Sequence, residues 1–254
     1  MEVSSQSEKS TSSCPYNKCD GSGMFLIDDD NAKICQCQHD KIIDRKLEFA
    51  NIPKEFQALT IKSFEIDIYT RPDSKTIATI AKKVAANFVK NFEEFQDEGK
   101  GLYMYSTEAG SGKTRMAISI GNALIKVKRV QVKYTKTVDL LNEITDTFNS
   151  NSEMSQKELI DSIRKVEVLI LDDVGVENPT PWVKSTFYSI LDSRMDNKKV
   201  TIFTSNLSLD ELKHDRRLKS RIERMATPVK FPEESIRNNL ARQENERLQR
   251  LLLE

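Results

Sequence analysis

The sequence has no apolar run that approaches the roughly 20 residues a membrane-spanning helix needs. It also has no excess of either charge, because 39 lysines and arginines balance 39 aspartates and glutamates. This balance gives no global signal for nucleic acid, so any DNA contact has to come from local basic patches. Residues 1–13, MEVSSQSEKSTSS, are polar and lack an apolar core. We therefore expect a disordered tail there and not a secretory signal.

Cysteine is missing from most of the chain, because all four cysteines fall within residues 14–37. The disulfides of a secreted protein would be spread more evenly, so a metal site in a reducing cytoplasm is the better interpretation. The spacing C-x4-C followed by C-x-C predicts a structural zinc site with four thiolate ligands in a cytoplasmic protein. The predicted ligands are Cys14, Cys19, Cys35 and Cys37. The alternatives are His39 in place of one cysteine, or four free thiols in an unfolded segment.

The rest of the chain divides into a small module and a larger α/β domain. Residues 23–35 indicate two short strands around an Asp-Asp-Asp-Asn turn, and a connecting helix is expected to begin at Lys41 and to stop near Pro53. From about residue 61 strands and helices alternate, which predicts a parallel sheet with helices on both faces. Helices are expected at 74–95, 113–127, 137–148, 155–165 and 181–195, and strands at 101–106, 130–135, 166–173 and 200–206. The predicted division is tail 1–13, zinc module with helical connector 14–60, and α/β domain 61–254.

The stretch STEAGSGKTRMA, residues 106–117, nearly matches the phosphate-binding pattern G-x-x-x-x-G-K-[ST] between a strand and a helix. In such a loop, backbone N–H groups cradle phosphates, the lysine reaches the outer phosphates and the hydroxyl binds magnesium. The residues in these roles are Gly110, Ser111, Gly112, Lys113 and Thr114. Thr107 replaces the first glycine. Because threonine is poor at positive φ, we expect an ordinary dihedral there, retained binding and a slightly different loop shape.

Polar residues end two of the predicted strands. Asp172 and Asp173 close the apolar run VEVLILDD, and ligands bind at the carboxyl ends of parallel strands. We expect Asp172 to hold magnesium together with Thr114, and Asp173 to orient or deprotonate the attacking water. Asn206 ends VTIFTSN, where it is placed to reach the γ-phosphate or that water. Its alternative is a turn or helix-cap role.

Two basic groups stand out. The segment HDRRLKSRIERM carries Arg217, Arg221 and Arg224 on one helix face. This face is either solvated, or it supplies an arginine that stabilises transition-state charge in a neighbouring subunit. The second group consists of Lys126, Lys128 and Arg129. Contact with single-stranded DNA is one interpretation of it, and a solvated surface is the other, since single-strand grooves usually add aromatic side chains.

The ordered set GSGKT, LILDDVG, FTSN, LKSRIERM and ESIRNNLARQEN resembles the AAA+ ATPases of the DnaC/DnaI helicase-loader and IstB group, over about residues 50–240. The resemblance implies an AAA+ P-loop NTPase fold, a three-layer αβα parallel sheet with a short C-terminal helical lid. It also implies that Arg221 acts in trans and that Arg237 contacts the nucleotide from the lid. The usual glycine before the ESIR box is absent, and Glu233 and Glu234 stand there.

The function implied by the resemblance is ATP-dependent loading of a hexameric replicative helicase onto single-stranded DNA during replication initiation. Such a protein uses ATP and Mg²⁺, self-associates through the ATP site and needs no membrane. The zinc module would grip the helicase, and it favours a loader over an IstB-type transposition helper, which generally lacks one. A nucleotide-binding adaptor or inhibitor of a helicase or host loader is the third possibility. Two departures from the family pattern, Thr107 and the missing lid glycine, are the features that favour this third possibility.

Overall fold

The central sheet has five parallel strands in the order β4-β5-β6-β3-β7. The computed structural model describes residues 14–27, 31–149, 153–175, 180–212 and 216–253, so the predicted tail, 1–13, lies outside it. The strand bounds are Gly101–Tyr105 (β3), Val132–Lys136 (β4), Val168–Asp172 (β5), Val200–Ser205 (β6) and Ala226–Lys230 (β7). Strand β4 forms one edge, and the loop strand β3 lies between β6 and β7.

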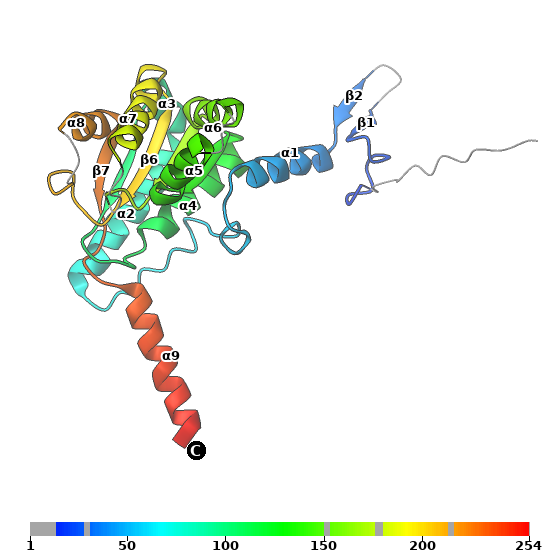
Figure 1. The fold of residues 1–254 in the computed structure, drawn as a ribbon. Helices are drawn as coiled ribbons and strands as arrows, with labels where there is room; N and C mark the ends of the chain where they lie inside the picture. The colour runs from blue at the N-terminus through cyan, green and yellow to red at the C-terminus, as the bar shows by residue number, and fades with distance from the viewer. Residues whose placement is uncertain (1–13, 28–30, 150–152, 176–179, 213–215, 254) are drawn as a thin grey trace, which may run out of the picture.

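Helices cover both faces of this sheet (Figure 1). One face packs against α2 (Pro72–Lys90) and α4 (Lys113–Ala123), and the other against α5 (Thr137–Asn149), α6 (Glu153–Lys165), α7 (Pro181–Asp196) and α8 (Arg216–Met225). Strand β5 shows why its sequence is apolar throughout. Val168 and Ile170 enter the first core, while Leu169 and Leu171 enter the second. A strand covered on both faces has no solvent side, and the predicted three-layer αβα fold is confirmed.

Two predicted helices differ from those observed. The helix predicted at 74–95 is interrupted at Asn91, whose φ of −102° and ψ of 29° separate α2 from α3 (Phe92–Glu98). Across this break, Phe92 packs edge-on against Phe88, with ring centroids 5.9 Å apart. The helix predicted at 113–127 ends as α4 at Ala123 and continues as the π-helical turn η2 (Leu124–Lys128). The wider turn keeps two consecutive residues, Leu124 and Ile125, buried.

The N-terminal module is a hairpin joined to the α/β domain by one helix (Figure 1). Strands β1 (Met24–Leu26) and β2 (Ala32–Ile34) pair antiparallel as predicted, and residues 28–30 of the expected turn lie outside the described residues. The connecting helix α1 (Gln36–Phe49) begins earlier than the pattern predicts. The short helix η1 (Lys54–Phe56) follows it. Between them, Ala50 and Ile52 are buried in the core beside α2 and α4.

After β7, the described residues contain one helix, α9 (Ile236–Leu253). It projects away from the body of the domain, with its first turn next to the phosphate loop (Figure 1). The predicted C-terminal lid is therefore a single helix over the part of the chain that the structure describes. None of the described helices is both long enough and apolar enough to cross a membrane.

Candidate nucleotide and metal sites

The phosphate loop joins β3 to α4, as the sequence predicts. Gly110 and Gly112 have φ angles of 80° and 96°, in the left-handed region where side chains are strained. Gly112 precedes the first residue of α4 and has no side chain to cap that helix. The first N–H groups of a helix without a side-chain cap are available to an anion, and the helix dipole favours one there. This geometry fits a phosphate group.

Lys113 lies inside the loop, with only 6% of its surface exposed. Its Nζ donates to the carbonyl oxygens of Ser106 and Glu108, at 3.2 and 3.0 Å, and to Ser111 Oγ at 3.3 Å. Burial lowers the pKa of Lys113 from its ordinary value, and the nearby carboxylates, Asp173 foremost, oppose that shift. The Lys113 ammonium group is thus bound by neutral acceptors of the loop. Charged phosphate oxygens would form stronger hydrogen bonds with it than these acceptors do.

Asp172, at the end of β5, is fixed by three hydroxyl groups. Its Oδ1 accepts from Thr114 Oγ1 at 2.8 Å and from Thr204 Oγ1 at 2.6 Å, and its Oδ2 accepts from the Tyr134 hydroxyl at 2.9 Å. Asp172 is 4% exposed. Carboxylate and hydroxyl oxygens are the hard ligands that Mg²⁺ prefers, so the pair Thr114 and Asp172 fits a magnesium ion. The sequence predicts this pair, but it did not identify Tyr134 or Thr204.

Asp173 adopts a left-handed backbone conformation, with φ of 62°. Two contacts with β6 and the residue after it hold this conformation: the Asp173 N–H donates to Thr204 Oγ1 at 2.9 Å, and Asn206 Nδ2 donates to Asp173 Oδ1 at 2.9 Å. A non-glycine residue in this region is uncommon and has to be held by its surroundings. The structure thus brings together the two side chains predicted to handle the attacking water, and Thr204 holds both acids.

The start of α9 lies against the phosphate loop. The Ile236 N–H donates to the Gly110 carbonyl at 3.0 Å. A Cβ added at Gly110 would approach Ser235 Oγ to 2.8 Å and Arg237 Cβ to 3.0 Å, so the loop has no room for a side chain there. Arg237 is exposed and lies next to the loop. This position suits the predicted contact from the lid, which stays a prediction.

The two departures from the expected pattern also meet at this point. The Thr107 N–H donates to Glu233 Oε2 at 3.0 Å, and the Thr107 hydroxyl donates to the same oxygen. Ser106 Oγ adds a contact of 3.3 Å to that oxygen. The next residue, Glu234, binds the N-terminus of α2 through the N–H groups of Thr70 and Arg71, at 2.8 and 3.2 Å. The segment before α9 therefore joins the loop to α2.

Arg221 lies on α8 at the margin of the buried face formed by Leu218, Ile222 and Met225. Its Nε donates to Asp192 Oδ1 of α7 at 2.5 Å, and its guanidinium lies 5.3 Å from the centre of the Tyr188 ring. Its side chain is 24% exposed. Arg221 is thus held in place within its own chain while part of it faces outward, which is compatible with both the solvated and the trans interpretation.

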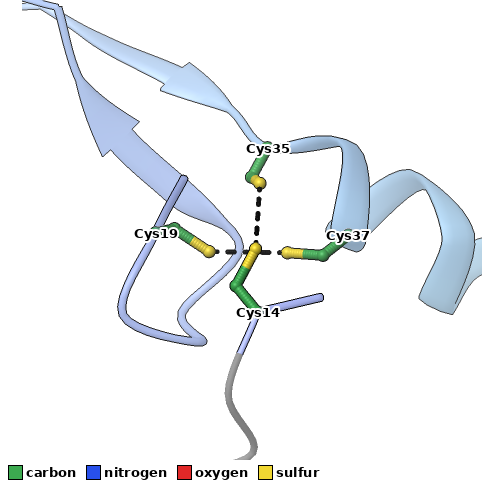
Figure 2. A group of neighbouring side chains, drawn as sticks. All are labelled: Cys14, Cys19, Cys35 and Cys37. Carbon is green, nitrogen blue, oxygen red and sulfur yellow. Dashed lines mark hydrogen bonds between the residues drawn. The ribbon is translucent and has the colours of Figure 1, made fainter. Parts of the chain in front are cut away.

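The four cysteines converge in the N-terminal module (Figure 2). All their sulfur atoms lie within 4.8 Å of one another, with Cys14 to Cys35 at 3.6 Å and Cys19 to Cys37 at 3.4 Å. Tetrahedral zinc with Zn–S bonds of about 2.3 Å requires sulfur separations of about 3.8 Å, so the cluster fits that ion. His39 lies outside this group, and its Nδ1 is buried with no hydrogen-bond partner among the described residues.

Backbone N–H groups assist the cluster. The N–H of Lys18 is the main cause that lowers the pKa of the Cys14 thiol to about 6, whereas burial raises the pKa of Cys37 to about 12. The thiols are free. An ion with two positive charges would favour the thiolate form at all four positions.

The sequence matches the family described as "IstB-like ATP binding protein" over residues 26–228, which is most of its length. The chain belongs to this family. The match spans β1 to β7 and therefore includes the phosphate loop, Asp172 and Asp173. Membership makes the chain an ATP-binding protein, in agreement with the geometry of the loop.

Individual relatives agree with this assignment. The IstB-like chain is 32% identical over 203 residues to the uncharacterized protein YqaM of Bacillus subtilis, a match that covers 78% of this chain and 62% of YqaM. It is 32% identical over 168 residues to the replicative helicase loader DnaI of the same organism, covering 60% of this chain and 52% of DnaI. The chain thus spans about half to three-fifths of these relatives.

Solved structures show the same fold. A crystal structure of DnaI superposes with a TM-score of 0.59 at 27% identity, covering 72% of the IstB-like chain and 95% of the chain in that crystal structure. A crystal structure of the DnaC helicase loader superposes with a TM-score of 0.60 at 22% identity, covering 71% and 100% respectively. The second likeness is one of fold alone.

The basic group that follows α4 makes contacts within the chain, two through lysine side chains and one through the Arg129 backbone. Lys126 Nζ donates to the Gln57 carbonyl at 2.9 Å, and Lys128 pairs with Glu93 at 2.8 Å. The Arg129 carbonyl accepts from Lys46. These residues lie at the opposite end of α4 from Lys113. Their contacts are those of a structural surface, and contact with DNA stays a prediction.

Proposed function

We propose that this chain is an ATPase that loads a hexameric replicative DNA helicase onto single-stranded DNA during replication initiation. The observation that carries the proposal is that α1 joins a four-cysteine module to an α/β domain in which the phosphate loop lies beside Asp172. Relatives named replicative helicase loader, DnaI and DnaC, support it. Because the chain spans only part of their length, the partner and the activity are inferred and not transferred whole.

In the ATPase, the phosphate loop and Lys113 would hold the phosphates, and Thr114 and Asp172 would hold Mg²⁺. The ion supplies charge neutralisation at the phosphates. Asp173, fixed by Asn206, would accept the proton of the attacking water. Arg237 would approach from the lid. Arg221 would complete the site of a neighbouring subunit, so self-association through the ATP site is part of this proposal.

The N-terminal module, residues 14–60, would hold zinc and bind the helicase. Zinc would supply folding free energy that so small a core lacks. The outer face of its hairpin is apolar and open: Leu26 is 72% exposed and Ile34 is 53% exposed. Exposed apolar side chains gathered on one face are typical of a protein-binding surface. The boundary at residue 60 is part of the proposal. The end of the connector packs against the α/β domain, where Ala50 and Ile52 are buried.

The test is native mass spectrometry of the full chain mixed with the replicative helicase of its source or host, with and without ATP. We expect a defined complex that is lost in the variant Leu26→Ser/Ile34→Ser. Ile80→Ser, at a position 57% exposed on α2, is the matched control and should still bind. Absence of a complex under all nucleotide conditions would contradict the loader and favour the transposition helper. A complex with no ATP turnover, with or without single-stranded DNA, would favour the adaptor or inhibitor.

A further inference from the structure

Tyr134 connects two parts of the molecule through two different groups. Its hydroxyl donates to Asp172 Oδ2 at 2.9 Å, while Asp172 Oδ1 is the oxygen beside Thr114. Its backbone N–H donates to the Ala50 carbonyl of the connector at 2.8 Å. Tyr134 lies on the edge strand β4 and is 6% exposed. One residue thus contacts both the predicted magnesium carboxylate and the chain that leads from the cysteine module.

The connector occupies the open edge of the sheet. Alternate N–H groups of an edge strand face away from the sheet and have no partner strand, and Ala50 supplies an acceptor for the one at Tyr134. Next to this bond, Leu47 and Ile52 of the connector and Tyr134 line a cleft of about 710 Å³. The cleft borders the contact at Ala50 and Tyr134, but Leu47, Ala50 and Ile52 are themselves buried in the core that contains Tyr134, so the connector packs against the edge of the sheet here.

We propose that Tyr134 is a positioning residue for the magnesium carboxylate of Asp172 and that it transmits the placement of the connector to that carboxylate. The inference rests on the proposed ATPase function. Hydroxyl donors on both oxygens leave the buried carboxylate one orientation, with Oδ1 beside Thr114. Loss of the phenol would leave Oδ2 without its donor and allow the carboxylate to rotate. Groups that orient a metal ligand in this way commonly change metal affinity by about 10–100-fold.

The first test is Tyr134→Phe, which keeps the ring and removes the hydroxyl. With a fluorescent ATP analogue, the Mg²⁺ concentration for half-maximal binding should rise about tenfold, while binding in EDTA should stay at the wild-type level. A general loss of structure would weaken both. The matched control is Tyr103→Phe, because Tyr103 is buried on β3 and its hydroxyl donates to the Leu207 carbonyl at 2.8 Å. It should leave the Mg²⁺ dependence unchanged.

The two possible failures are distinguishable. Wild-type Mg²⁺ dependence in Tyr134→Phe would overturn the inference alone. A wild-type chain that binds no nucleotide with or without Mg²⁺ would overturn the proposed ATPase and the inference together.

The second test concerns the connector. Leu47→Ala, or Ile52→Val if the first variant unfolds at the assay temperature, should raise the Mg²⁺ midpoint in the wild-type background and not in Tyr134→Phe. The reason is that the connector's influence would pass through the phenol. Equal increases in both backgrounds would overturn the transmission by Tyr134.

Discussion

Thr107 and Glu233, the two positions where glycine is expected, bind each other. The carboxylate of Glu233 accepts the N–H and the hydroxyl of Thr107. A glycine at 107 would remove the hydroxyl, and a glycine at 233 would remove the acceptor. The two departures therefore compensate, and they tie the exit of β3 to the segment that leads into the lid. The two departures from the expected glycines thus form one hydrogen-bonded contact between Thr107 and Glu233.

This pairing predicts energetic coupling between the two side chains. Thr107→Val removes the hydroxyl at nearly constant volume, and Glu233→Gln removes the charge. In a double-mutant cycle followed by urea unfolding, we expect a coupling energy of about 1 kcal/mol, the net contribution of a typical hydrogen bond. The control cycle combines Thr107→Val with Glu211→Gln, whose carboxylate binds Ser208 instead. That control should be additive, and additivity in the first cycle would show that the contact is not formed in solution.

Lys113 is predicted to be required for nucleotide binding. The Lys113 ammonium group, which donates to the Ser106 and Glu108 carbonyls, would bind phosphate oxygens in the nucleotide complex. The substitution Lys113→Ala removes this positive charge. Loss of a charge-assisted contact of this kind should weaken ATP affinity on the order of 100-fold. Isothermal titration with ATP and Mg²⁺ measures the effect, and Lys126→Ala, at the other end of α4, should bind normally. Equal affinity for Lys113→Ala and the wild type would refute the assignment of the loop.

Arg221 is predicted to act on a neighbouring subunit. Arg221→Ala should leave ATP binding by the monomer nearly intact and lower turnover in the assembly by about 10³-fold, the effect of losing an arginine supplied in trans. Arg224→Ala, an exposed position on the same helix, is the matched control. Mixing Arg221→Ala with Lys113→Ala should restore part of the turnover, because each variant supplies what the other lacks. Normal turnover by Arg221→Ala alone would reject the action in trans and leave the arginine its structural contact with Asp192.

The fold and the ends of the strands could be predicted from the sequence because both follow local patterns. Apolar runs such as VLIL mark strands covered on both faces, and polar residues at their ends mark the ligand edge. The contacts that hold the site could not be predicted, because they join residues distant in sequence. Tyr134 lies 38 positions from Asp172, and Thr107 lies 126 positions from Glu233. Asn91 interrupts a predicted helix although the apolar pattern runs through it, since Phe88 and Phe92 on either side of the break are still four positions apart and in contact.

The cysteine cluster is predicted to hold one zinc ion per chain by the four-ligand rule. Metal analysis of the purified chain measures this, and Cys35→Ser should lose the ion while Ser22→Ala, in the neighbouring loop, keeps it. Because zinc binds thiolates, its removal by a chelator should become easier as pH falls. Limited proteolysis should then cut within residues 14–40 and spare the sheet. A metal-free chain with an intact, protected N-terminal module would exclude the zinc site.

Glu234 is predicted to make stability depend on pH. Burial alone would raise its pKa, but hydrogen bonds from Thr70 and Arg71 outweigh this effect and lower the pKa from 4.5 to about 2. A carboxyl group whose pKa is lower in the folded state stabilises the fold above the unfolded pKa, and this contribution declines as pH falls from about 4.5 towards 2.

Glu234→Gln should therefore lower the free energy of unfolding by about 1–2 kcal/mol at pH 7, the range for loss of a helix cap or a charged hydrogen bond. The difference from wild type should shrink steadily below pH 4.5, because the Glu234 carboxylate of the unfolded wild-type chain is then protonated while that of the folded chain stays charged, so protons favour unfolding. Urea unfolding at pH 7, 5 and 3.5 measures it, with the exposed Glu65→Gln as the control that shows no such trend. A difference that stays constant with pH would mean that Glu234 acts through its shape at the start of α2 and not through its charge.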